Sequence, residues 1–189
     1  MSYTLMELYF ALPPIDPTEA ALPVPEQLKR IRAQVFGPGI DSHTRLLALL
    51  RLIWDRPPEV FWPALIDTCD MCDDTWWLRP LLLDLMRSQQ ALPYVQPLQW
   101  PVQIYRGCSR PRVRGVSWTM DRKVAEGFAR GHRGISVPDP VVAEAVVERV
   151  AVFAMLNERE ESELLIDPRR LRKLTVHKWE VQELSKPAA

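Results

Sequence analysis

The pattern of apolar residues changes near residue 100, and this change limits the possible folds most strongly. In residues 1–100, apolar side chains recur at spacings of three and four, as at Leu28, Ile31 and Val35, which predicts helices. In residues 101–189, short segments rich in Val predict strands with one helix among them. We therefore expect an α+β protein with a helical N-terminal part, residues 1–100, and a sheet-containing core, residues 101–189.

The local signals place several elements within each part. In the first part, Pro25 occupies the first turn of one helix, Asp41 or Ser42 caps a second that ends before Pro57, and apolar segments follow at 60–66 and about 76–87. In the second part, we expect strands at 102–106, 115–119, 141–148, 150–155, 164–166 and 174–180. The single helix of this part would start at Asp121 and end at Gly131.

Composition and charge narrow the class of protein. The chain has 18 Pro but only 7 Gly, so its loops are stiffened and each Gly calls for a reason. The net charge is zero, which excludes a uniformly basic nucleic-acid binder. The charge is uneven, however: residues 1–100 hold 8 basic and 12 acidic residues, and residues 101–189 hold 16 and 12.

The cysteines and histidines suggest neither disulfides nor metal. Cys69, Cys72 and Cys108 are too few for a disulfide framework and indicate a reducing compartment. Cys69-x-x-Cys72 has no second pair or neighbouring His to complete a zinc site, so we expect ordinary thiols and no metal. We see no secretion signal and no apolar stretch suited to a transmembrane helix. We expect a cytoplasmic protein, in the producing or a target cell, without membrane attachment.

Three short motifs of the second part carry the chemistry. They are Tyr105-Arg106-Gly107, Ser117-Trp118-Thr119 and Glu161-Ser162-Glu163. In order and flanking context they resemble the Arg–Ser–Glu class of ADP-ribosyltransferases. That family has an Arg at the end of the first core strand, a Ser-x-Thr element on the second, and a Glu-x-Glu element entering a later strand. The resemblance covers roughly residues 100–180 and implies a split β-sheet core on which the helical part packs.

This resemblance implies that the chain binds NAD as a co-substrate. Arg106 would grip the pyrophosphate, because a planar guanidinium binds such oxygens in pairs, and Gly107 would allow close backbone approach. Glu163 would hold the ribose 2′-hydroxyl and stabilise the oxocarbenium-like ribose as nicotinamide leaves. Ser117 would orient Glu163. The remaining positions assigned to the NAD site are Tyr105, Trp118, Thr119 and Phe128.

Glu161 would act on the acceptor. On an extended segment it faces the same side as Glu163, so it would orient and partly deprotonate an incoming nucleophile. In the family, Glu at this place accompanies transfer to arginine, which favours a protein arginine as acceptor. Glu158-x-Glu160 also matches Glu-x-Glu, but we prefer Glu161 and Glu163 because an apolar strand and Asp-Pro follow directly. The chain departs from the family pattern at Trp118, where a small residue is usual.

The alternatives concern the acceptor and the presence of catalysis. Residues 106–133 hold eight basic and two acidic residues, a balance that also suits an acidic protein surface or a nucleic-acid backbone. A nucleic-acid ADP-ribosyltransferase or an NAD glycohydrolase is therefore an alternative, and a third is an inactive module that binds NAD or a partner. The family makes a bacterial or phage toxin or effector the expected context, with an inhibitor or antitoxin as a possible partner.

Overall fold

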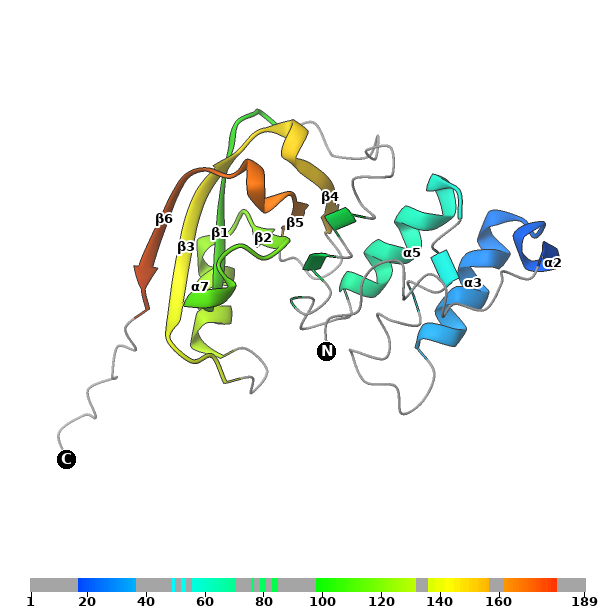
Figure 1. Ribbon diagram of the computed structural model, residues 1–189, viewed down its shortest axis with the longest axis horizontal. Coiled ribbons are helices and arrows are strands. Elements are labelled where there is room, and N and C mark those ends of the chain that lie inside the picture. Colours follow the sequence, from blue (N-terminus) through cyan, green and yellow to red (C-terminus); the bar gives the residue numbers. More distant parts are fainter. Residues whose placement is uncertain are drawn as a thin grey trace. The chain divides into compact units, whose positions relative to one another are not determined.

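The chain separates into two compact units, Met1–Tyr94 and Val95–Ala189. The computed structural model describes residues 17–36, 49, 52–53, 56–70, 76, 79–80, 83–84, 98–131, 136–156 and 162–179. Over these residues the first unit is helical and the second contains every strand, so the α+β class is confirmed (Figure 1). None of the described helices is long and apolar enough to cross a membrane.

The first unit contains helices α2 (Pro17–Ala20), α3 (Val24–Val35) and α5 (Pro58–Asp70). Pro25 lies in the first turn of α3, where its missing N–H costs no hydrogen bond. The face of α3 that carries Ile31 and Val35 is buried, as the spacing predicts, and α3 packs against α5. The expected second helix and the expected segment near 76–87 lie mostly outside the described residues.

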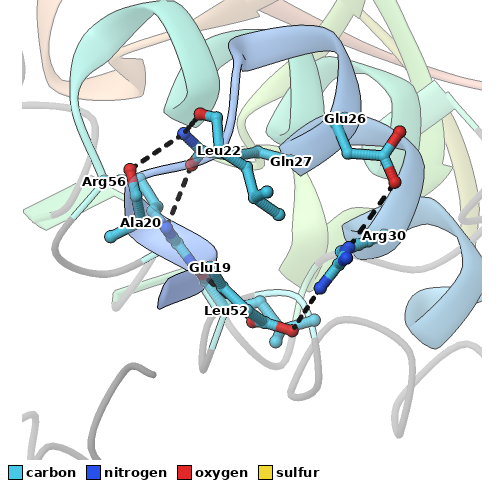
Figure 2. Close-up of polar contacts among 8 residues, drawn as sticks. All are labelled: Glu19, Ala20, Leu22, Glu26, Gln27, Arg30, Leu52 and Arg56. Carbon is cyan, nitrogen blue, oxygen red and sulfur yellow. Dashed lines mark hydrogen bonds and ion pairs between the residues drawn. The ribbon is translucent and has the colours of Figure 1, made fainter. Parts of the chain in front are cut away.

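A buried polar network joins three segments of this unit (Figure 2). Arg56, whose side chain is 4 % exposed, donates to the Gln27 side-chain oxygen at 3.0 Å and the Leu52 carbonyl at 3.3 Å. Its Nη2 lies 3.8 Å from a carboxylate oxygen of Glu19 on α2. Gln27 in turn donates to the Leu22 carbonyl at 2.7 Å. The network therefore satisfies a buried charge and holds α2 and α3 against the segment before α5.

The second unit contains one antiparallel sheet in the strand order β4-β5-β2-β1-β3-β6. The described strands are β1 (Val102–Ser109), β2 (Ser117–Thr119), β3 (Pro140–Val147), β4 (Val152–Leu156), β5 (Glu163–Ile166) and β6 (Arg172–Lys178). Short 3₁₀ turns lie at Arg110–Arg112, Arg149–Ala151 and Pro168–Arg170. The strand segments expected from the sequence correspond to these six, with shifted ends.

The pairing between β1 and β2, in the middle of the sheet, is short. β1 pairs with β3 over its whole length, whereas the register between β1 and β2 consists of one pair, Tyr105–Thr119. The expected split sheet is thus a single sheet over the described strands, with its weakest joint between β1 and β2. The first two sequence motifs lie on β1 and β2, and Glu163 of the third motif begins β5, the other neighbour of β2.

The two faces of the sheet are covered differently. Ile104 and Cys108 of β1 share a buried cluster with Trp118 of β2 and Leu164 of β5. The opposite face carries helix α7 (Arg122–Arg130), which packs on β1 and β3 (Figure 1). Because successive side chains of a strand point to opposite faces, Tyr105 and Gly107 lie on the α7 face.

Helix α7 has the ends that the sequence predicts. The Asp121 side chain accepts the Lys123 backbone N–H at 2.7 Å, which caps the N-terminus. Gly131 ends the helix in the left-handed region with φ 98°, a conformation that suits glycine. Ala125 and Ala129 form its buried face, and their small side chains allow the helix to lie close to the sheet.

Candidate functional site

Ser117 and Glu163 form a hydrogen-bonded pair on neighbouring strands. The Ser117 hydroxyl donates to a carboxylate oxygen of Glu163. In the β2–β5 register Thr119 lies opposite Glu163 and Ser117 opposite Leu165, so Ser117 and Glu163 are diagonal neighbours on one face. Both side chains are partly exposed. The structure therefore brings together two of the predicted catalytic residues, 46 positions apart in the chain.

Arg106 reaches this pair through the main chain. Its Nη1 donates to the Ser117 carbonyl and its Nε donates to the Arg112 carbonyl at 3.2 Å. These bonds tie β1 to the start of β2 where the strand pairing has ended. Within the described part of the chain no carboxylate forms an ion pair with Arg106. The partly exposed guanidinium, bonded to two neutral main-chain carbonyls, thus keeps a positive charge that no described carboxylate pairs with, which favours an anionic ligand.

Gly115 and Trp118 support Arg106 in its position. A Cβ atom on Gly115 would lie 2.4 Å from Nη2 of Arg106, so the guanidinium occupies the space that a side chain would take. The indole N–H of Trp118 donates to the Gly115 carbonyl at 3.0 Å and fixes that peptide. Trp118 is 1 % exposed and belongs to the core, so its place between Ser117 and Thr119 is explained by packing. The scarcity of Gly was the one signal that pointed to Gly115.

Cys108 also lies next to Arg106, on the same face of β1. Burial raises the pKa of the Cys108 thiol above its usual value. The charge of Arg106, the hydrogen bond between the two side chains and the charge of Arg112 act in the opposite direction and lower that pKa by less. Burial therefore favours the protonated thiol beside Arg106.

Gly107 has a packing role in the structure. A Cβ there would lie 1.7 Å from the Ala125 carbonyl oxygen and 2.6 Å from the Ala129 nitrogen. The close approach that the sequence assigned to NAD is made by the main chain of α7. Gly107 therefore sets the distance between helix and sheet beside Arg106.

The other predicted positions fall into two groups. Tyr105 and Thr119 face each other across the β1–β2 joint, and the Thr119 hydroxyl accepts the Asp121 backbone N–H at 3.0 Å, next to the α7 cap. Phe128 lies on α7 and is partly buried. Glu161 lies outside the described residues, so its predicted role on the acceptor stays a prediction.

No group of three or more His, Cys, Asp or Glu side chains is placed to hold a metal ion in the described part of the chain. Comparisons of the chain with protein-family profiles, with curated proteins and with solved structures found no significant match. Any assignment of function therefore depends on the arrangement of Arg106, Ser117 and Glu163.

Proposed function

We propose that this protein transfers ADP-ribose from NAD to a macromolecular acceptor, as the resemblance to the Arg–Ser–Glu class implies. The observation that carries the proposal is the hydrogen-bonded Ser117–Glu163 pair, together with the bond from Arg106 to the Ser117 main-chain carbonyl. Its residues come from the first strand of the second unit, from the next strand, and from the start of a later strand, the order that the family keeps. One residue from each of the three motifs thus takes part in these two contacts.

The carboxylate of Glu163 would perform the central electrostatic task. Cleavage of the glycosidic bond leaves the electron pair on nicotinamide and positive charge on the ribose. The Ser117 hydroxyl holds this carboxylate in place by a hydrogen bond. The carboxylate can therefore accept a hydrogen bond from the ribose 2′-hydroxyl and stabilise the positive charge without changing its own position. The acceptor nucleophile then supplies the electron pair for the new bond to the ribose carbon and releases a proton.

Arg106 would bind the pyrophosphate of NAD. Two of its N–H groups hold main-chain carbonyls, and a guanidinium has five in all. The bonds to the carbonyls fix the guanidinium plane in advance, which lowers the entropy lost on binding a phosphate. The uncompensated charge supplies the attraction.

The acceptor and the setting follow from the family resemblance. Glu161 would orient a protein arginine as the incoming nucleophile. A toxin or effector acting in the cytoplasm, held in check by an inhibitor or antitoxin, is the setting that the resemblance implies. Hydrolysis of NAD without transfer, and binding of NAD or a partner without catalysis, are the alternative outcomes of the test.

The test is an incubation of the full chain with labelled NAD and a cell lysate. Glu163→Gln keeps the size and a hydrogen-bond acceptor for Ser117 but removes the charge, so we expect transfer and nicotinamide release to fall by about 100-fold or more. Glu126→Gln on α7 is the matched control, because Glu126 pairs with Arg122 on the helix surface, and it should retain wild-type activity.

Each outcome of this test separates the candidates. Label that depends on Glu163 and resists washing supports the transferase. Nicotinamide release without label would point to a glycohydrolase. Intact NAD with the wild-type protein, or equal activity of wild type and Glu163→Gln, would refute the proposal and favour the binding module.

A further inference from the structure

Strand β6 is the outermost strand on one side of the sheet and is strongly basic. It lies beside β3, at the end of the strand order (Figure 1). Residues 168–178 contain no acidic residue, and their Arg, Lys and His residues are Arg169, Arg170, Arg172, Lys173, His177 and Lys178. The other edge strand, β4, consists of apolar residues without charge. The two edges of the sheet therefore differ in the partners that they suit.

The free edge of β6 presents main-chain groups that have no partner among the described strands. The Trp179 N–H donates to the Pro140 carbonyl beside β3 at 2.9 Å. Because the direction of main-chain hydrogen bonds alternates along an antiparallel strand, His177 also faces β3 with its N–H and C=O groups. The N–H and C=O groups of Val176 and Lys178 therefore face away from the sheet. They form a row to which another extended chain can add.

Two lysines of β6 carry positive charge without a described ionic partner. Arg172 pairs with Glu148 at 2.9 Å. In the described part of the chain no carboxylate forms an ion pair with Lys173 or Lys178, and both side chains are exposed. The two lysines lie near the two ends of the strand. A segment that adds along β6 therefore gains from acidic side chains near both of its own ends.

The two faces of β6 set what the middle of such a segment should carry. Leu174 and Val176 are partly buried and pack against the core cluster that contains Trp118. Thr175 and His177 lie on the opposite face and are exposed. An added strand therefore fits best if apolar and polar residues alternate in its middle, with the apolar ones next to Leu174 and Val176.

A second copy of the chain is a poor occupant of this edge. Two β6 strands paired with each other would set basic residues against basic residues, because the strand contains no acidic residue. Lysines on an edge strand discourage such pairing. Strand β4 carries no negative charge that would complement Lys173 and Lys178. A nucleic acid would meet the lysines but would not continue the main-chain pairing of the sheet, so an acidic polypeptide matches both features.

We propose that β6 binds an acidic, extended segment of a partner protein, which adds to the sheet as a further strand. The main-chain groups of Val176 and Lys178 hold the segment, and Lys173 and Lys178 select acidic residues at its ends. Strands β3 and β1 lie between β6 and the strand that carries Ser117, so the segment docks away from the candidate site. The binding needs neither NAD nor Glu163 and is independent of the proposed function.

The binding is tested by fluorescence anisotropy of the full chain with the labelled peptide Glu-Glu-Val-Thr-Val-Thr-Val-Glu-Glu. We expect saturable binding that weakens as salt is added. Lys173→Gln combined with Lys178→Gln should weaken it by about fivefold. The control, Lys29→Gln combined with Lys123→Gln, removes the same charge from exposed positions of α3 and α7 and should bind as wild type does.

Two further measurements test the main-chain pairing. The same peptide with N-methyl groups on its Val and Thr residues keeps its charge but loses main-chain donors, so it should bind at least about tenfold more weakly. Amide exchange followed by NMR should slow by at least about tenfold at Val176 and Lys178 when the peptide is bound, and change little at His177 and Trp179, which already face β3.

Several results would overturn the inference. They are equal binding by the two double variants, undiminished binding of the N-methylated peptide, and preference for a labelled single-stranded oligonucleotide over the peptide. Self-association that protects the Val176 and Lys178 amides without peptide would assign the edge to a second copy and so reject an acidic partner. Glu163→Gln should bind the peptide as wild type does. Peptide binding by a protein that leaves NAD intact would refute the transferase while supporting the role of β6.

Discussion

Each unit holds an arginine that donates to main-chain carbonyls, and the two arginines differ in what surrounds them. Arg56 is enclosed, with a carboxylate of Glu19 and the side chain of Gln27 among its partners (Figure 2). Arg106 is partly exposed, and its partners among the described residues are neutral carbonyls and the thiol of Cys108. The charge of Arg56 is therefore paired inside the protein, whereas the charge of Arg106 is available to a ligand.

The comparison shows how a structural arginine is told from a binding one. Both side chains hold distant segments together, so bonding to the backbone does not distinguish them. The two are distinguished by whether the charge is compensated. An arginine that is fully paired inside the protein has a structural role, whereas an arginine whose charge is not paired within the protein suits the binding of a ligand. Four predictions test this distinction between a structural and a binding arginine.

The largest effect is expected at Arg56. Arg56→Ala would leave Gln27 and the Leu52 carbonyl without their buried donor, so we expect the free energy of unfolding to fall by about 3 kcal/mol. Arg30→Ala is the control, because Arg30 pairs with the same Glu19 at 3.8 Å but is 48 % exposed, and it should cost no more than about 0.5 kcal/mol. Urea denaturation measures both. Similar losses for the two variants would contradict the structural role of the buried network.

A second effect distinguishes the two glycines beside Arg106. Gly115→Ala places a Cβ against the guanidinium, which can move only by giving up its bonds to Arg112 and Ser117, so we expect a loss of about 1–2 kcal/mol. In an Arg106→Ala background this loss should largely disappear, giving a coupling energy near 1 kcal/mol. Gly107→Ala should remain destabilising by about 3 kcal/mol in both backgrounds, because its neighbours are main-chain atoms of α7. Additive losses for Gly115 and Arg106 would show that the guanidinium does not lie there.

These glycines also show what the sequence could and could not predict. Helix α7 was predicted with its ends because Asp121 and Gly131 signal a cap and a stop through neighbouring residues alone. β2 was expected from Gly115 but begins at Ser117, since the Gly115 N–H is bonded to the Arg112 carbonyl in a turn. The alternation of apolar residues does not reveal that turn, whose Arg112 carbonyl also accepts from the Arg106 side chain.

The sequence predicted the three motifs of the candidate site, but it did not predict how their side chains lie relative to one another. The order of Arg106, Ser117 and Glu163 along the chain led to the family resemblance. The pairing of β2 with β5, which makes Ser117 and Glu163 diagonal neighbours, depends on strand register between segments far apart in sequence. A glycine indicates that something approaches the backbone closely, but it does not indicate what. The sequence analysis expected NAD at Gly107, and the structure has the main chain of α7 there.

A third prediction concerns ligand affinity. Arg106→Lys keeps the charge but lacks the planar fork that holds two carbonyls while facing a phosphate. We expect KM for NAD to rise by about tenfold, equivalent to about 1.4 kcal/mol, with kcat reduced less. Steady-state nicotinamide release measures both constants, and Arg122→Lys on the α7 surface is the control. An unchanged KM would place Arg106 with Arg56 among the structural arginines and end the contrast between them.

The smallest effect is a pH dependence that Cys108 introduces beside Arg106. Burial raises the pKa of its thiol in the folded protein, so the protonated form is favoured on folding. The stability that this supplies is complete below the unfolded pKa, about 8.5, and is lost as pH rises through the folded pKa. Wild-type protein should therefore lose more stability than Cys108→Ala between about pH 8 and 10. Arg106→Ala should enlarge that loss, because the positive charge that partly offsets the shift is removed. Parallel pH profiles for wild type and Cys108→Ala, measured by urea denaturation, would mean that Arg106 cancels the effect of burial, and the positive charge at the site would then be greater than the structure indicates.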